Sequence, residues 1–286
     1  MTKILVLGAS GMLGNAMLRY FASCEGIFVR GTARSVRAIA NLPESVRDLV
    51  IPGVDAADID SLLRATAAFK PDVVINCMGL VKQLAEADDP LIALPMNALL
   101  PHRLRLIAAA VGARLIHIST DCVFSGRKGN YAESDNPDAA DLYGRSKLLG
   151  EVTGYADAIT LRTSIIGREL ASAHGLVDWF LAQDGPVKGY TRAIFSGVPT
   201  VELARVVHSY VLPYPSLHGL YHVATKSITK FDLLELVAKA YGHAIDIIPD
   251  DRLSIDRSLD ASRFDQETGY VPPTWQELIE KMRIFN

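Results

Sequence analysis

The sequence predicts an α/β protein built on a doubly wound parallel sheet, followed by a smaller α/β lobe. Short apolar runs alternate with helical patterns over residues 1–163, as expected for strands that helices cover on both faces. A glycine turn over residues 8–14 separates the first run from the first helical pattern. After about residue 164 the regular alternation ends. We therefore expect a Rossmann-type dinucleotide-binding domain at residues 1–163 and a substrate-binding lobe at 164–286, partly interleaved with the first domain.

Composition and charge argue against several classes of protein. The 286 residues carry a formal net charge of −3, which gives no reason to expect nucleic acid. The three scattered cysteines match neither a disulfide framework nor a zinc spacing, and the histidines show no ligand pairing, so no metal is expected. The N-terminus lacks a signal-peptide pattern, and no apolar stretch approaches the roughly 20 residues of a membrane span. We expect a reduced, cytoplasmic protein without a membrane partner, either a monomer or a homodimer.

The first strand and the glycine turn predict a dinucleotide site. The apolar run over residues 4–7 stops at Gly8, and glycines at positions 8, 11 and 14 precede a helical pattern. Glycines allow a tight turn and a close approach of the backbone to a pyrophosphate, which the free N–H groups of the helix N-terminus then bind. The spacing is G-x-x-G-x-x-G, and the alternative is a tight turn that binds nothing. The expected contacts are Gly8, Ser10, Gly11, Met12 and Leu13.

The second strand, expected over residues 28–34, indicates which dinucleotide binds. Arg34 follows Gly14 by twenty residues, where an NAD site holds an acidic side chain on the ribose. An arginine there would instead clamp a 2′-phosphate, so NADPH is favoured over NADH. A solvated surface arginine is the alternative. A weak third strand, residues 48–51, is followed by Asp55 and Ala56, where the adenine would lie.

Further strands and helices complete the predicted first domain. A helix over residues 58–69, capped by Asp58, precedes an apolar strand over 73–77. The end of this strand, with Cys77, Met78 and Gly79, should line the cofactor site. Lys82 is a candidate to bind a substrate phosphate or carbonyl, and a solvated surface lysine is the alternative. A helix over 91–111 carries Asn97, which would need hydrogen-bond partners if buried. The remaining expected elements are a strand over 115–119, a helix over 142–155 and a strand over 158–162.

The smaller lobe is expected to lie beside the carboxyl ends of the sheet, where α/β proteins bind ligands. Its predicted elements are helices over 177–181, 201–210, 231–241 and 275–282, and strands over 189–196, 221–223 and 245–248.

Tyr143, Lys147 and Thr120 form the predicted catalytic group. Tyr143 and Lys147 lie four residues apart, so a helix places them on one face. The pKa of an unperturbed tyrosine is about 10, and a neighbouring ammonium is expected to lower it towards neutrality. Lys147 could also hydrogen-bond the nicotinamide ribose. Thr120, at the end of a buried strand, can donate to a substrate oxygen. A Y-x-x-x-K pair alone is usually only a helix-surface pair, but the glycine turn and the strand ending in Ser-Thr favour catalysis.

The chain resembles the extended short-chain dehydrogenase/reductases, and among them the dTDP-4-dehydrorhamnose reductase family. The matching residues are Gly8–Gly14, Asn76, Asn97, Ser119-Thr120-Asp121-x-Val123-Phe124-x-Gly126, Tyr131-x-Glu133, Tyr143-Gly144-x-Ser146-Lys147-x-x-Gly150-Glu151, Arg162-Thr163-Ser164 and Gly197-x-Pro199-Thr200. The resemblance implies reduction by NADPH of the 4-keto group of a nucleotide-diphosphate 6-deoxy-hexulose. It places Thr120, Tyr143 and Lys147 at the family's catalytic positions.

Three departures from the family pattern refine this expectation. Cys122 stands where the family usually has tyrosine, in a region that touches the sugar, and Lys82-Gln83 departs from the usual Val-Asp-Lys-Ala-Glu loop. Some members dimerise through a magnesium held by glutamates, but the matching position on the first helix is Ala16, so the metal is not carried over. The departures point towards reductases that finish UDP-linked N-acetylated 6-deoxy sugars for surface polysaccharides. The expected substrate-binding residues are Lys82, Asp121, Cys122, Arg168 and Arg192. For a diphosphate-sugar substrate the smaller lobe should offer cations; Arg257 is a further candidate in its later part, although a solvated charge is the favoured interpretation there.

Two alternatives remain open from the sequence. A nucleotide-sugar epimerase or dehydratase would share the Tyr-Lys pair, but a dehydratase would want an acidic pair beside the threonine, and Asp121 is followed by Cys122. A non-catalytic NADP-binding regulatory subunit would keep the fold without turnover, and the intact Thr120, Tyr143 and Lys147 argue against it.

Overall fold

The main layer of the molecule is a parallel sheet of seven strands in the order β10-β6-β5-β4-β1-β2-β3. The computed structural model describes residues 1–285. Because strand order reverses beside β1, the carboxyl ends of β1 and β4 border the crevice where such sheets bind ligands. The strands are β1 (Thr2–Leu7), β2 (Ile27–Thr32), β3 (Val50–Ile51), β4 (Val73–Asn76), β5 (Arg114–Thr120), β6 (Ala158–Thr163) and β10 (Gly219–His222).

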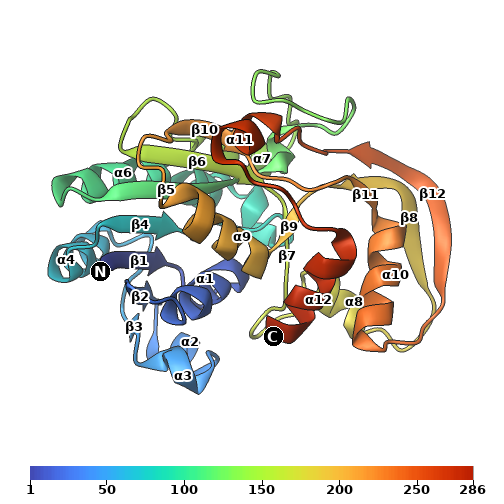
Figure 1. Cartoon of the computed structure of the whole chain (residues 1–286), viewed down its shortest axis with the longest axis horizontal. Helices are drawn as coiled ribbons and strands as arrows, with labels where there is room; N and C mark the ends of the chain where they lie inside the picture. Colours follow the sequence, from blue (N-terminus) through green and yellow to red (C-terminus); the bar gives the residue numbers. More distant parts are fainter. Residues whose placement is uncertain (286) are drawn as a thin grey trace.

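Helices cover both faces of this sheet, as doubly wound folds require (Figure 1). Alternate residues of β1 enter different cores: Ile4 and Val6 pack with α1 and α9, whereas Leu5 and Leu7 pack with α4 and α6. The helical elements of this part are α1 (Met12–Ala22), α2 (Val36–Ala40), α3 (Glu44–Arg47), α4 (Ile59–Phe69), η1 (Ala85–Asp88), α5 (Pro90–Ala93), η2 (Leu94–Leu99), α6 (Leu100–Ala110), η3 (Asp121–Val123), α7 (Leu142–Leu149), α9 (Thr200–Val206), η4 (Val207–Val211) and α11 (Ser262–Thr268).

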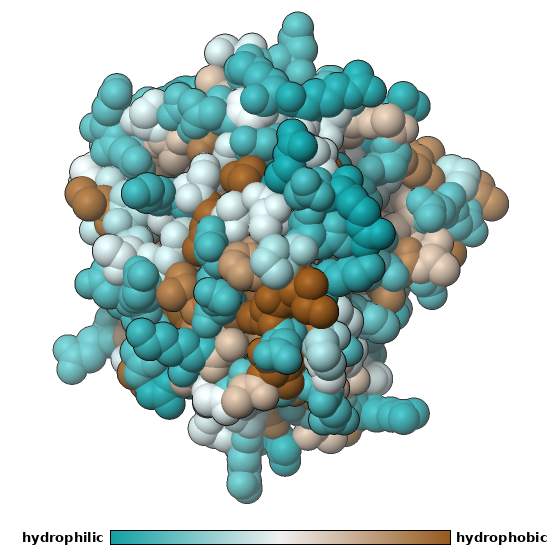
Figure 2. Space-filling model, turned by 90° about the vertical axis from the view of Figure 1, so that its right-hand side faces the viewer, coloured by the Kyte–Doolittle hydropathy of each residue, from teal (hydrophilic) through white to brown (hydrophobic). Residues whose placement is uncertain are grey.

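The smaller lobe is a second sheet, β11-β8-β12, packed on helices at the right of Figure 1. Its separate core joins Phe195 of β8, Leu233 of α10 and Trp275 of α12. The outer face of this side is mainly hydrophilic, with hydrophobic side chains gathered near its centre (Figure 2). The bounds are β7 (Ile165–Ile166), α8 (Leu176–Leu181), β8 (Val187–Phe195), β9 (Val198–Pro199), β11 (Ile228–Thr229), α10 (Lys230–Tyr241), β12 (Ile247–Asp256) and α12 (Trp275–Phe285).

Several predicted elements differ from the observed ones. The helix expected over 142–155 ends at Leu149, because Gly150 passes so close to the carbonyl oxygen of Asn97 that a Cβ there would lie 1.9 Å from it. The helix expected over 91–111 is interrupted by the π turn η2. The strand expected at 221–223 in the smaller lobe is instead β10, the edge strand of the main sheet. The chain thus returns to the first layer after residue 164.

Within residues 1–285, no helix is long and apolar enough to cross a membrane.

Candidate active site

The glycine turn between β1 and α1 has the geometry of a phosphate cradle. Gly8 has φ +81°, which L side chains rarely adopt, and a Cβ on Gly14 would lie 2.1 Å from the carbonyl oxygen of Gly8. Gly11 is the N-cap of α1 and provides no side-chain cap, so the first-turn N–H groups stay open to a ligand. A helix N-terminus open in this way favours an anion. The residues present therefore fit a dinucleotide pyrophosphate.

The other predicted cofactor residues lie at neighbouring strand ends. Arg34 follows the end of β2 and is exposed. The backbone N–H of Val54 donates to the carbonyl of Ala33 at 3.1 Å, which brings Asp55 beside the end of β2. Cys77, Met78 and Gly79 follow β4, and the N–H of Met78 donates to the side chain of Asn76 at 3.0 Å. The structure therefore brings these residues to one edge of the sheet, next to the glycine turn.

The start of α7 is held tightly against the end of β5. Asp141 caps the helix by accepting from the N–H of Gly144 at 2.7 Å. A Cβ on Gly144 would lie 2.3 Å from the carbonyl oxygen of Cys122, so only glycine permits this approach. As a result Tyr143 comes close enough to Thr120 for this hydroxyl to influence its pKa.

Asn97 anchors the same helix from the other side. Its Oδ1 accepts from the N–H of Leu80 at 3.0 Å, and its Nδ2 donates to Ser146 at 3.2 Å. The hydroxyl of Ser146 donates to the carbonyl of Tyr143 at 2.9 Å. The expectation that buried Asn97 has hydrogen-bond partners is confirmed, and its position in a π turn explains how one side chain reaches both the loop and α7.

The protonation of the Tyr-Lys pair differs from the expectation. Burial raises the pKa of Tyr143, the half-buried Cys122 raises it further, and the Thr120 hydroxyl only partly opposes this. Burial lowers the pKa of Lys147 to about 8, against the pull of Glu151. The ammonium of Lys147 donates to the carbonyl of Ile118 at 2.9 Å. The predicted lowering of the tyrosine pKa by Lys147 is therefore wrong: burial is the largest influence on this pKa, and the acidic groups that act on it besides are Cys122, Asp121 and Asp141, which raise it.

Lys82, Asp121 and Cys122 lie beside the start of α7 and Thr120. Lys82 forms a half-exposed ion pair with Asp141 at 2.7 Å, so it is tied to the cap of the catalytic helix. Burial raises the pKa of Asp121, while Arg257 and other groups oppose the shift. Burial likewise raises the pKa of the Cys122 thiol to about 12, which keeps it protonated near neutrality. Cys122 is thus a small neutral side chain beside Tyr143.

A buried ionic network of Arg162, Glu151, Ser119 and His222 lies next to the site. Arg162 donates to both carboxylate oxygens of Glu151 at 2.7 Å, and Ser119 donates to the same carboxylate at 2.8 Å. Arg162 also contacts His222 at 3.4 Å. Burial and Arg162 together lower the pKa of His222 to about 4, so the imidazole is neutral near pH 7. This network joins the ends of β5, α7, β6 and β10.

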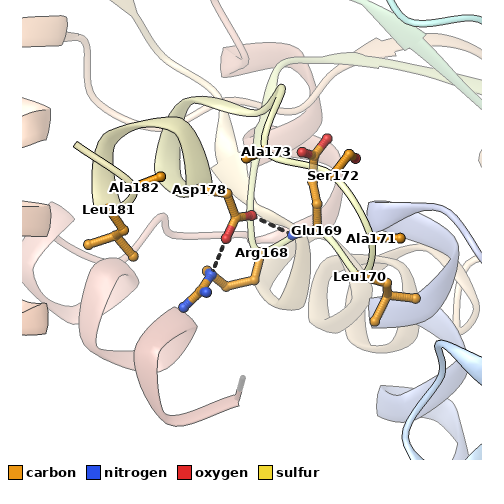
Figure 3. A pocket seen from close by; sticks show the side chains of 9 residues that line it. All are labelled: Arg168, Glu169, Leu170, Ala171, Ser172, Ala173, Asp178, Leu181 and Ala182. Carbon is orange, nitrogen blue, oxygen red and sulfur yellow. Dashed lines mark hydrogen bonds and ion pairs between the residues drawn. The ribbon is translucent and has the colours of Figure 1, made fainter. Parts of the chain in front are cut away.

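Arg168 and Arg192 are not brought to the catalytic group by any contact among residues 1–285. Arg168 is paired with Asp178 and lines a separate cavity of about 540 Å³ formed largely by the 168–173 loop and α8 (Figure 3). Neither Tyr143 nor Lys147 lines this cavity. Arg192 is an exposed residue of β8.

Two cations from the smaller lobe do approach the site. Lys230 begins α10, and Arg257 follows β12; both interact electrostatically with Asp121. Sequence analysis missed Lys230 and treated Arg257 as a solvated charge. No local pattern could identify them, because their approach depends on how β11 and β12 flank β8.

Comparison with known proteins identifies the family. The model of the RmlD substrate binding domain matches residues 1–283. The chain belongs to this family. Among curated relatives, a probable low-salt glycan biosynthesis reductase, Agl14, of Haloferax volcanii is 27% identical over 292 residues, covering 95% of this chain and 94% of that protein. The dTDP-4-dehydrorhamnose reductase of Mycolicibacterium smegmatis is 29% identical over 258 residues, covering 84% and 69%. Methionine adenosyltransferase 2 subunit beta of Danio rerio is 28% identical over 259 residues, covering 84% and 74%.

Solved structures of dTDP-4-dehydrorhamnose reductases share the fold. The dTDP-4-dehydrorhamnose reductase of Clostridium acetobutylicum superimposes with a TM-score of 0.79 at 22% identity, covering 99% of both chains. That of Bacillus anthracis, solved in complex with NADP, gives a TM-score of 0.78 at 20% identity and also covers 99% of both chains. The Rossmann-type fold predicted from the sequence is confirmed.

Proposed function

We propose that this protein is an NADPH-dependent reductase of the 4-keto group of a nucleotide-diphosphate 6-deoxy-hexulose. One observation carries the proposal: Tyr143 meets Thr120 at the carboxyl end of β5, with Lys147 one helical turn away and the glycine turn nearby. The family supports a reductase, since relatives that match most of the chain carry that name.

The charge state of the site suits reduction. The glycine turn and Arg34 would hold NADPH. When bound, this cofactor would supply a hydride to the carbonyl carbon of the substrate. Because burial keeps Tyr143 protonated, the phenol starts as an acid and donates its proton to the carbonyl oxygen. Thr120 donates a hydrogen bond to the same oxygen. Lys147, when protonated, stabilises the phenolate that forms. The free-energy cost of burying its ammonium falls as the negative charge on Tyr143 develops.

Within this substrate class we favour a UDP-linked 2-acetamido-2,6-dideoxy-hexulose. Cys122 stands where related reductases have tyrosine, and its smaller side chain leaves room beside Tyr143 for a bulkier sugar substituent. Asp121 and Lys82 act electrostatically on Cys122 and are proposed to contact the substrate. Such a product would serve surface polysaccharide synthesis.

An NADPH-oxidation screen tests the function. Purified protein is given several nucleotide-linked 4-keto-6-deoxy sugars, with and without the 2-acetamido group, and NADPH consumption is followed together with product formation. We expect one NADPH oxidised per sugar reduced. An epimerase would instead convert sugar without net loss of NADPH.

The relatives named as a subunit of methionine adenosyltransferase suggest a second candidate, a binding subunit without turnover. Tight NADPH binding with no oxidation of the cofactor by any sugar in the screen would favour that candidate and defeat the reductase.

A further inference from the structure

The carboxyl end of β4 carries a pair of buried polar side chains that the proposed mechanism does not use. Asn76 ends β4, and His117 lies opposite it on β5 in the register of the main sheet. Both are buried, with 1% and 0% of their surface exposed. Nδ1 of His117 lies 3.1 Å from Nδ2 of Asn76. Buried polar groups cost free energy unless they are hydrogen-bonded, so the bonds of this pair show what the histidine contributes.

The hydrogen bonds of Asn76 determine which nitrogen of His117 carries the proton. Oδ1 of Asn76 accepts from the backbone N–H of Met78 at 3.0 Å. The amide nitrogen Nδ2 therefore faces His117, and because this nitrogen only donates, Nδ1 of the imidazole must accept. The ring proton is then on Nε2, and burial lowers the pKa of His117, which keeps the ring neutral. Nε2 itself is buried and has no hydrogen-bond partner within residues 1–285.

The unpaired Nε2 separates two explanations for this histidine. A buried donor without a partner destabilises the fold, so a leucine would serve the core of the sheet at least as well. What His117 provides and leucine lacks is the acceptor at Nδ1. That acceptor keeps the amide of Asn76 in the orientation in which its oxygen faces Met78.

The segment that Asn76 holds, residues 77–79, lies between the glycine turn and Lys147. On one side, a Cβ on Gly8 would lie 2.9 Å from Cγ and 3.3 Å from the backbone nitrogen of Met78. On the other side, a Cβ on Gly79 would lie 3.9 Å from Nζ of Lys147. A shift of this segment would therefore change both the space beside the glycine turn and the surroundings of the lysine.

A second amide holds the far end of the same segment. Oδ1 of Asn97 accepts from the N–H of Leu80 at 3.0 Å, and its Nδ2 donates to Ser146 at 3.2 Å. Each amide thus binds a backbone N–H through its oxygen and is kept in that orientation by a partner on its nitrogen. His117 has the role for Asn76 that Ser146 has for Asn97.

We infer that His117 is a positioning residue for the cofactor: its Nδ1 orients the amide of Asn76, and that amide holds Met78 against the glycine turn. The inference rests on the proposed function, because residues 77–79 are proposed to contact NADPH. His117 itself lies below the segment in the sheet and acts only through Asn76.

Fluorescence titration with NADPH, without any sugar, tests this role with three replacements of His117. His117→Asn places an amide oxygen near the position of Nδ1, His117→Gln places its polar group near Nε2, and His117→Leu has neither. We expect NADPH affinity to fall about three- to tenfold in the Gln and Leu variants, the effect of losing about one hydrogen bond, and to stay within about twofold of wild type in the Asn variant.

Asn76→Leu completes a double-mutant cycle. Because His117 acts through Asn76, His117→Leu should lose its effect on NADPH affinity in the Asn76→Leu background. Thr160→Val is the matched control. It removes a buried hydroxyl that lies opposite His117 on β6 and bonds with the backbone of Val152 instead of with Asn76. This control should bind NADPH as the wild type does, and thermal unfolding shows whether each variant is folded at the temperature of the titration.

Nitrogen NMR of the wild type measures the inferred tautomer without reference to binding. Long-range ¹⁵N–¹H correlation spectra distinguish an imidazole protonated on Nε2 from one protonated on Nδ1, and comparison with His117→Leu identifies the signal. We expect an unprotonated Nδ1 near neutral pH. A proton on Nδ1 would overturn the inference, because that nitrogen could not then accept from Asn76.

Three binding results would also overturn it: a loss in His117→Asn as large as in His117→Leu, an undiminished effect of His117→Leu in the Asn76→Leu background, or no NADPH binding by the wild type. The proposed function fails separately. If the variants show the expected order of NADPH affinity and no nucleotide-linked ketosugar is reduced, the reductase is wrong and the positioning role stands. If sugar is reduced and all three variants bind NADPH as the wild type does, the positioning role is wrong and the reductase stands.

Discussion

The phenol of Tyr143 is the group on which the proposed chemistry depends. Because burial keeps it protonated, the protein presents an acid to a ketone rather than a base to an alcohol. Tyr143→Phe removes the acid with little change of shape. We expect turnover to fall by about 10²–10⁴-fold, the usual range for loss of a general acid, with NADPH affinity within about threefold. Steady-state kinetics and fluorescence titration of NADPH measure the two quantities. Equal turnover in variant and wild type would contradict the role.

Arg34 is the residue proposed to distinguish the two nicotinamide cofactors. Its exposed side chain follows β2, so it can close on a 2′-phosphate without rearrangement of the core. Arg34→Ala should weaken NADPH binding about tenfold or more and leave NADH binding nearly unchanged, because only NADPH carries the phosphate. Titration with both cofactors measures this. Parallel losses would show that Arg34 does not contact the 2′-phosphate.

Lys147 should make stability depend on pH. Its pKa is about 8 in the folded protein and about 10.4 in an unfolded chain, so between these values the unfolded state binds more protons. The free energy of unfolding therefore rises with pH through this window, and the cost of the buried ammonium is fully present below it. Lys147→Met lacks this cost. We expect its stability relative to wild type to fall by about 2–3 kcal/mol between pH 7 and pH 10.

Urea unfolding at several pH values measures that difference. The exposed Lys239 of α10 provides the control, since Lys239→Met makes the same change of residue type at a position that buries no ammonium. The same pH dependence in both variants, or a pH-independent difference for Lys147→Met, would mean that burial of Lys147 does not cause the effect.

At the scale of elements, the close approach of α7 to the 121–123 turn positions the proposed catalytic group. Gly144→Ala would place a Cβ 2.3 Å from the carbonyl oxygen of Cys122 and so push the helix away from Thr120. We expect kcat to fall by about 10²-fold, because a displacement of about 1 Å at a reacting group has this effect. Circular dichroism should show an intact fold. Gly154→Ala is the control, since no atom lies within 4 Å of a Cβ there. Equal kcat in the two variants would contradict the positioning role.

The elements also show what the sequence could predict. The glycine turn, the order of the first six strands and the Tyr143–Lys147 spacing were predictable because each depends on neighbouring residues. The position at which α7 ends was not predictable, because it depends on the close contact of Gly150 with the backbone of Asn97, a residue more than fifty positions away. The direction of the tyrosine pKa depends on burial, which spacing does not reveal. Lys230 and Arg257 converge only through the pairing of β11 and β12 with β8.

At the scale of the whole molecule, the two parts of the chain share one core. After residue 164 the chain adds α9, β10 and α11 to the main sheet and only then completes the smaller lobe. Leu203, Val207 and Tyr221 are buried in the same cluster as Ile4 and Val6 of β1. The buried Arg162 of β6 also contacts His222 of β10. The predicted boundary between residues 163 and 164 therefore does not separate two independently packed units, because segments on both sides of it share the main sheet and its core.

This shared core predicts that residues 1–163 do not fold alone. Without the returning segments, one face of the sheet loses α9 and exposes apolar side chains that the full chain buries, and each lost large apolar contact costs about 1.5–3 kcal/mol against a total stability of only about 5–15 kcal/mol. We expect fragment 1–163 to aggregate or to bind a hydrophobic dye, to show no cooperative thermal transition and to lack NADP binding. The fragment 1–285 provides the control and should behave as the full chain. Cooperative unfolding of fragment 1–163 together with NADP binding would show instead that the cofactor domain is autonomous and that α9 and β10 are additions to a complete fold.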